Sequence, residues 1–87
     1  MYHHFMNIDT SILDNNVEEM YNIISANVIK YRKEKKLSQL QLAIEIGLTG
    51  NAFIARAEKR TNNAHFNIEQ IVKISTILDI SFCEFFK

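Results

Sequence analysis

The segment from Leu37 to Glu58 constrains the fold more than any other part of the chain, because it carries a helix start, a turn and a second helix in close succession. Residues 38–41 read Ser-Gln-Leu-Gln, the Ser-x-x-Gln pattern of a capping box that begins a helix. Gly47 then stands where a glycine in the left-handed conformation ends a helix and reverses the chain. The segment therefore predicts two short helices joined by a tight turn, the second over about 51–59.

The composition supports helices throughout. The chain has 87 residues, with no Pro and only 2 Gly, whereas a β-rich fold usually needs more turn residues. An apolar fraction of 47% argues against general disorder. We expect one small all-α domain, whose modest core favours dimerisation.

A longer first helix is expected before this segment, from about Val17 to Lys36. Residues 14–16 read Asp-Asn-Asn and are candidates for its N-cap. Apolar residues at three-to-four spacing predict a buried stripe on this helix: Met20 or Tyr21, Ile24, Val28 and Tyr31. Residues 1–16 are assigned to an N-terminal arm, which the sequence leaves open as an arm, a partner strand or a short helix.

Two further helices are expected after the segment, which makes five in all within a domain spanning residues 17–87. Both begin with capping-box patterns, at Asn67 to Gln70 and at Ser81 to Glu84. The first of them has a predicted buried stripe made of five aliphatic residues: Ile68, Ile71, Ile74, Ile77 and Leu78.

The formal net charge is zero, but the charges are unevenly distributed. Residues 1–27 hold four acidic residues and no Lys or Arg, whereas residues 28–60 hold eight basic and three acidic residues. Positive charge therefore gathers on the two-helix segment and its approach, where phosphates of a nucleic acid would be attracted. A solvated basic surface without a partner is the plainer alternative.

Several classes of function have little support. Cys83 is the only cysteine, so neither an internal disulfide nor a cysteine-cluster zinc site is expected. His3 and His4 have no ligands at metal-binding spacing. No catalytic pattern stands out, so we expect no enzyme activity and no cofactor. The chain start is unlike a signal peptide and no apolar run reaches membrane-spanning length, so we expect a cytoplasmic protein.

The chain resembles the phage repressor and Cro family of helix-turn-helix domains. The resemblance covers Val28 to Phe86 and depends on motifs that occur in the family's order: Leu37-Ser38-Gln39, Leu42-Ala43, Gly47-Leu48-Thr49 and Ala57-Glu58, with residues 31–35 before them and 77–85 after. It implies a five-helix lambda-repressor-like DNA-binding domain with a longer first helix and an N-terminal arm. The helix-turn-helix would span about residues 38–59.

The function implied by this resemblance is sequence-specific DNA binding by a transcriptional regulator. Such a regulator would act as a repressor and bind a palindromic operator in double-stranded DNA as a homodimer. Arg56 is the best base-reading candidate, because arginine can bind guanine O6 and N7 in a bidentate way. The other base-reading candidates are Asn51, Ala52 and Ala55. The expected phosphate contacts are Gln39, Ser38, Thr49, Lys59, Arg60, Asn62 and Lys36.

Arg32 and Glu58 match a pair that forms a semi-buried salt bridge between the first and third helices of the family. The chain also departs from the family pattern, because it has one extra residue between Gly47 and Glu58. This insertion leaves the register of the base-reading residues open.

The sequence leaves two alternative functions open. One is an antitoxin or restriction-modification controller with the same domain, in which a toxin or other protein partner would meet residues 1–27. Another is a protein-interaction module that has lost DNA binding, which the zero net charge and the alanine-rich third helix favour. Leu40 and Ile44 are apolar on a usually exposed side of the second helix, where they would form a dimer contact or dock the arm.

Overall fold

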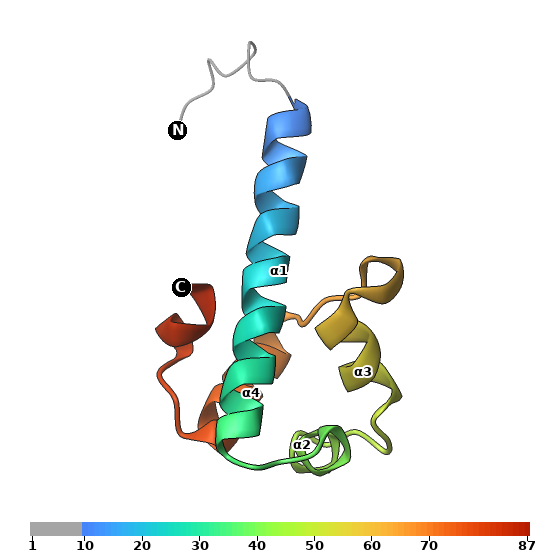
Figure 1. The fold of residues 1–87 in the computed structure, drawn as a ribbon, viewed down its shortest axis with the longest axis vertical. Coiled ribbons are helices and arrows are strands. Elements are labelled where there is room, and N and C mark those ends of the chain that lie inside the picture. The colour runs from blue at the N-terminus through green and yellow to red at the C-terminus, as the bar shows by residue number, and fades with distance from the viewer. Residues whose placement is uncertain (1–9) are drawn as a thin grey trace.

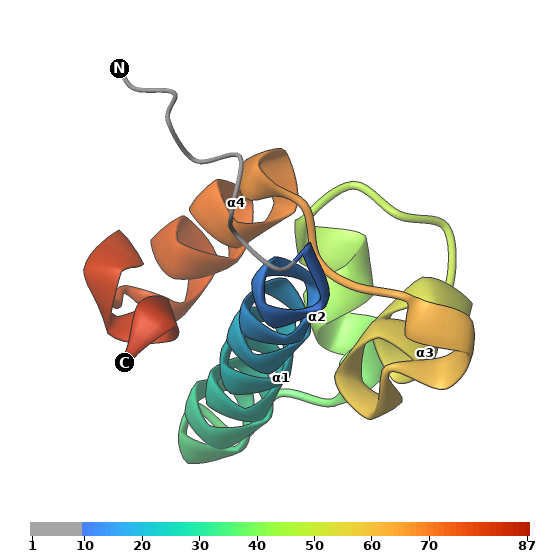
Figure 2. The same cartoon turned by 90° about the horizontal axis from the view of Figure 1, so that it is seen from above.

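The computed structural model describes the backbone of residues 10–87 and the side chains from Leu13 onward, and all its regular structure is helical (Figure 1). Its helices are α1 (Thr10–Glu34), α2 (Gln39–Glu45), α3 (Ala52–Lys59) and α4 (Ile68–Leu78), with 3-10 helices η1 (Thr61–Asn63) and η2 (Phe82–Phe86). Over the described residues the all-α prediction is confirmed, with four α-helices and two 3-10 helices in place of the five predicted helices. Seen from above, α3 lies on one side of α1, and α4 with η2 lies on the other (Figure 2).

Helix α1 begins earlier than predicted. It starts at Thr10 rather than Val17, so residues 10–16 of the predicted arm are its first two turns. The cap candidates at 14–16 lie inside the helix, and no Gly or Pro nearby interrupts it. Residues 1–9 of the predicted arm lie outside the described residues. The first turns of α1 project beyond the rest of the domain (Figure 1).

The core lies between the second half of α1 and the remaining helices. From the predicted stripe of α1, Ile24 and Val28 are buried, and Tyr21 rather than Met20 packs against the core. The prediction for α4 is partly wrong: Ile71, Ile74 and Leu78 are buried, but Ile68 is 62% exposed and Ile77 is 36% exposed. The reason is that α4 is covered on one side only, and these two residues lie at the edges of that side.

Three of the four α-helices end in the same kind of turn. After α2, the N–H of Leu48 donates to the carbonyl of Ala43 and that of Gly47 donates to Ile44, which is a Schellman motif. The same pair of bonds closes α1 at Lys36 and Leu37, and closes α4 at Asp79 and Ile80. Only Gly47 is a glycine; Lys36 and Asp79 adopt left-handed φ values of 60° and 55°. The residue that follows each turn, Leu37, Leu48 or Ile80, packs against the core.

Two of the three predicted capping boxes are confirmed, and the third is absent. Capping boxes are present at Ser38 and at Asn67, each with reciprocal bonds to the residue three positions later. Ser81 makes no side-chain capping bond, and the last segment is a 3-10 helix. Phe85 of this segment is fully buried, meets the Tyr31 ring edge-on, and accepts a 3.0 Å hydrogen bond at its carbonyl from Asn27 Nδ2.

Candidate nucleic-acid interface

Helices α2 and α3 pack against each other through small and aliphatic side chains. Leu42 and Ala43 of α2 and Ile54 and Ala57 of α3 are fully buried. The connection spans residues 46–51 and begins with the turn at Gly47, whose φ is +92°. Helix α3 begins at Ala52, one residue later than predicted, with Asn51 at its N-cap position.

A buried ion pair fixes α3 against α1. Arg32 Nε lies 2.7 Å from Glu58 Oε2, and Arg32 Nη2 lies 3.0 Å from Glu58 Oε1. The two residues are 7% and 8% exposed. Arg32 Nη1 also donates to the Leu37 carbonyl at 2.8 Å. The fork geometry is the strong bidentate form of this interaction, and it holds α3 in one orientation.

The Gln39 side chain joins the same network. Its Nε2 donates to Glu58 Oε1 at 2.9 Å. One of its two amide N–H donors is therefore used inside the protein, where it positions α2 against α3, and the other is left for the predicted phosphate contact. Ser38, the other candidate at this helix start, uses its hydroxyl oxygen to accept from the Gln41 N–H at 3.0 Å.

The outer face of α3 presents most of the predicted base-reading residues together. Ala52, Arg56 and Lys59 are exposed, and Ala55 between them is half-buried. Asn51 occupies the N-cap position, is exposed, and makes no side-chain capping bond. Thr49 is exposed just before it, and Lys36 is exposed at the end of α1. This face thus combines two cations with two small residues that permit close approach.

Arg60 does not belong to this face, contrary to its predicted role in phosphate binding. Its Nε donates to the Ala64 carbonyl at 2.7 Å, its Nη1 to Asn22 Oδ1 at 2.8 Å, and its Nη2 lies 2.6 Å from Glu18 Oε2. The guanidinium also lies 5.2 Å from the centre of the Tyr21 ring. Because most of its donors are used internally, Arg60 attaches the chain after α3 to α1. Asn62 in the same loop is exposed, with a left-handed φ of 52°.

Arg60→Ala is expected to lower the free energy of unfolding by about 1–2 kcal/mol, because charge-assisted hydrogen bonds from a largely covered guanidinium are lost. Urea unfolding followed by circular dichroism measures the change. Lys59→Ala, at the exposed neighbouring position, is the matched control and should change stability by less than about 0.5 kcal/mol. Equal effects of the two substitutions would contradict the internal role of Arg60.

Two contacts at this site could not be found from the sequence. The His65 ring stacks on the Tyr21 ring with centroids 3.9 Å apart. The Ser25 hydroxyl donates to the Ala57 carbonyl at 2.8 Å, where α1 meets α3. In the sequence His65 looks like an ordinary loop residue and Ser25 like an ordinary helix residue, because their partners are more than 30 positions away along the chain.

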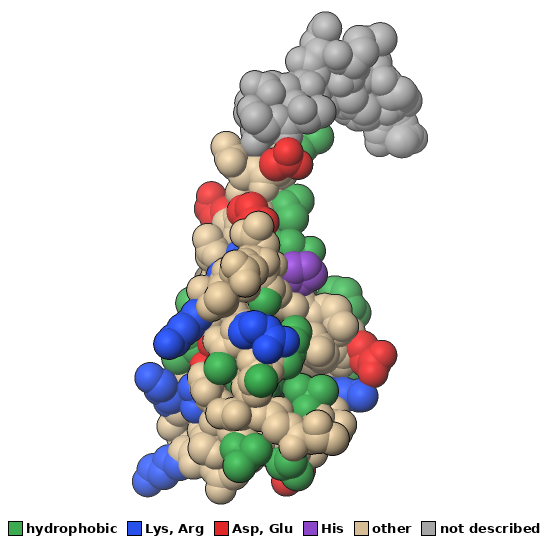
Figure 3. Space-filling view, turned by 90° about the vertical axis from the view of Figure 1, so that its right-hand side faces the viewer, with side chains coloured by type: hydrophobic (Ala, Val, Ile, Leu, Met, Phe, Trp, Pro, Cys, Tyr) green, Lys and Arg blue, Asp and Glu red, His purple; other side chains and the backbone are tan. Residues whose placement is uncertain are grey.

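Charge is separated along the molecule. Acidic side chains gather on the projecting end of α1, and basic side chains gather nearer the body of the domain (Figure 3). Among the described residues, no group of three or more His, Cys, Asp or Glu is placed to hold a metal ion. Over the same part of the chain, none of the helices has both the length and the apolar character needed to cross a membrane.

Comparisons with known proteins add no relative. No family model, no curated protein and no solved structure matches this chain.

Proposed function

We propose that the protein is a sequence-specific DNA-binding transcriptional regulator that represses by binding a palindromic operator as a homodimer. In this proposal α2 and α3 form a helix-turn-helix of the lambda-repressor-like kind, and α3 enters the major groove. Arg56 reads a guanine, Asn51 contacts an adenine or a phosphate, and Lys59, Lys36 and Thr49 contact the DNA backbone.

The observation that carries this proposal is the outer face of α3. It presents Arg56 and Lys59 to solvent on a helix whose orientation is fixed by the ion pair between Arg32 and Glu58. A rigid helix is what base recognition requires, because hydrogen bonds to base edges depend on position. Ala52 allows the backbone of this helix to approach the bases closely.

Selection of bound sequences from a random duplex pool tests the proposal, with Arg56→Ala run in parallel. We expect an enriched inverted repeat for the unchanged protein. The variant should lose about 1–3 kcal/mol of discrimination at one position of each half-site, because the bidentate contact to guanine is removed.

Lys73→Ala is the matched control for that selection. Lys73 is a basic residue on α4, paired with Glu69 at 2.9 Å and remote from α3 in sequence and in the fold. Its replacement should leave the selected sequence unchanged. A folded protein that enriches no sequence at low salt would overturn the proposal.

A protein-interaction module is the second candidate function. The observation that favours it is the apolar outer side of α2, where Leu40 is 49% and Ile44 is 55% exposed. The two functions differ in their response to salt. Binding to random duplex should weaken steeply as salt rises if the protein contacts phosphates, whereas an interaction module should show no such binding.

A further inference from the structure

The projecting end of α1 carries an apolar stripe that the domain itself does not cover. The overhang stripe consists of Leu13, Val17 and Met20. With Ile24, where α1 enters the core, they have a spacing of four, three and four residues, which is that of a two-stranded coiled-coil seam. Leu13 is 48%, Val17 50% and Met20 38% exposed, while Ile24 is buried at the base. Contiguous exposed apolar side chains of this kind mark interaction sites on soluble proteins when the patch is large.

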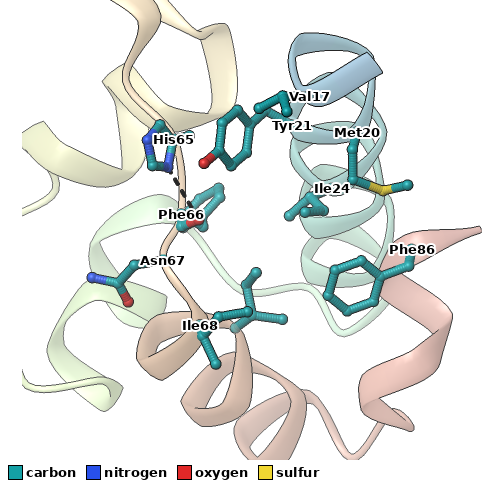
Figure 4. Close-up of a pocket in the computed structure, with 10 residues that line it drawn as sticks. Val17, Met20, Tyr21, Ile24, His65, Phe66, Asn67, Ile68 and Phe86 are labelled. Atoms are coloured by element: carbon teal, nitrogen blue, oxygen red, sulfur yellow. Dashed lines mark hydrogen bonds between the residues drawn. The ribbon is translucent and has the colours of Figure 1, made fainter. Parts of the chain in front are cut away.

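An apolar groove lies beside the lower half of this stripe. Its volume is about 380 Å³, and its walls come from α1, α4, η2 and the chain before α4. Figure 4 shows Val17, Met20 and Ile24 on one side and Ile68 and Phe86 across from them. The polar atoms at its edge are few: His65 Nδ1 lies 3.4 Å from the Phe66 carbonyl oxygen. The groove therefore fits an apolar helix face rather than a charged ligand.

We propose that the overhang of a second copy of this chain fills the groove, with the two α1 helices antiparallel about a twofold axis. Val17 of each copy then packs against Met20 of the partner subunit, and Leu13 of each copy enters the groove of the partner subunit. The antiparallel pairing of the two α1 helices would be the interface of the homodimer in the proposed function. The inference therefore rests on that function.

Three observations favour a second copy over another occupant. A helical projection of about three turns that packs against nothing is only marginally stable in water. Each copy supplies both the projection and the groove, so a twofold arrangement satisfies both and closes. The overhang stripe itself contains no charge, and of the acidic residues beside it Glu18 is paired with Arg60 at 2.6 Å.

The geometry of α3 is compatible with this dimer. In an antiparallel pair the twofold axis is normal to the plane of the two helices. Successive residues of an α-helix lie about 100° apart around its axis. Ser25 and Arg32, whose side chains donate hydrogen bonds to α3, therefore lie about 80–100° around α1 from Ile24. Both copies of α3 therefore face the same side of the dimer, along the twofold axis.

The distance between the two copies of α3 in this dimer also agrees with the distance between consecutive major grooves of DNA. The twofold axis would pass between positions 18 and 19 of α1. At 1.5 Å per residue, Ser25 and Arg32 lie about 10 and 20 Å from that axis, so the two copies of α3 are about 20–40 Å apart along α1. This range includes the separation of about 34 Å between consecutive major grooves on one side of DNA.

The test compares two double substitutions in the full chain without DNA. Leu13→Glu with Val17→Glu places four carboxylates in the proposed interface. Leu40→Glu with Ile44→Glu is the matched control, because it changes two aliphatic residues that are equally exposed but lie on α2. Sedimentation equilibrium over a range of concentrations gives the mass, and circular dichroism checks that each variant is folded.

We expect a mass of twice 10.2 kDa for the unchanged protein and for the α2 variant. The overhang variant should dissociate with a Kd raised more than about tenfold. Leu13→Ala with Val17→Ala, which keeps a high helix propensity, should weaken the dimer in the same direction by a smaller factor. A monomer at all concentrations, or dissociation by the α2 pair, would overturn this interface. Because no DNA is present, the result is separate from the outcome of the sequence selection.

Discussion

Glu58→Ala is expected to lower the free energy of unfolding by about 3–5 kcal/mol, because it leaves the buried Arg32 guanidinium without its carboxylate. The substitution also removes the acceptor of the Gln39 amide, so one change breaks bonds from α1 and from α2. Urea unfolding monitored by circular dichroism gives the difference directly. For a domain of 87 residues, a loss of this size is a large part of the total stability.

Two further variants separate charge burial from helix effects. Glu45→Ala changes an exposed glutamate on α2 and should alter stability by less than about 0.5 kcal/mol. Replacing both members of the pair, Arg32→Met with Glu58→Leu, should cost less than Glu58→Ala alone, because no uncompensated charge remains. A cost below about 1 kcal/mol for Glu58→Ala would show that water reaches Arg32 and that the pair is not structurally important.

Phe85→Ala is expected to destabilise the protein by about 3–5 kcal/mol, because it empties a fully buried site. The ring contacts Tyr31 of α1, with centroids 5.6 Å apart, and Asn27 of α1 bonds to the same residue's carbonyl. These contacts hold η2 against α1, so the substitution should also release the end of the chain. Thermal or urea unfolding measures the cost.

Phe82→Ala is the control for this second prediction. It removes the same atoms from a half-buried position in the same 3-10 helix, so its cost should be clearly smaller, at about 1–2 kcal/mol. Similar costs at the two positions would mean that the burial of Phe85 does not set the strength of this contact.

The features predictable from the sequence are those decided by near neighbours or by a family pattern. The capping boxes at Ser38 and Asn67 need only residues three positions apart. The pairing of Arg32 with Glu58 was expected only from the resemblance to a known family, and no periodicity in this chain would have indicated it.

The features that the sequence did not predict depend on distant parts of the chain. Arg60 has the composition of a phosphate contact, and only the folded chain places Glu18 and Asn22 beside it. Ile68 and Ile77 continue the apolar spacing of α4, but their exposure depends on how much of α4 the other helices cover. The start of α1 was placed too late because Asp14 and its neighbours favour a cap without requiring one.

The turns that end α1 and α4 have a consequence for how this chain folds. Lys36 and Asp79 are held in a conformation that a peptide with the same local sequence would rarely adopt, and burial of Leu37 and Ile80 offsets that strain. We therefore expect these helix boundaries to be better defined in the folded domain than in isolated peptides of the same sequence, because only the folded domain buries Leu37 and Ile80.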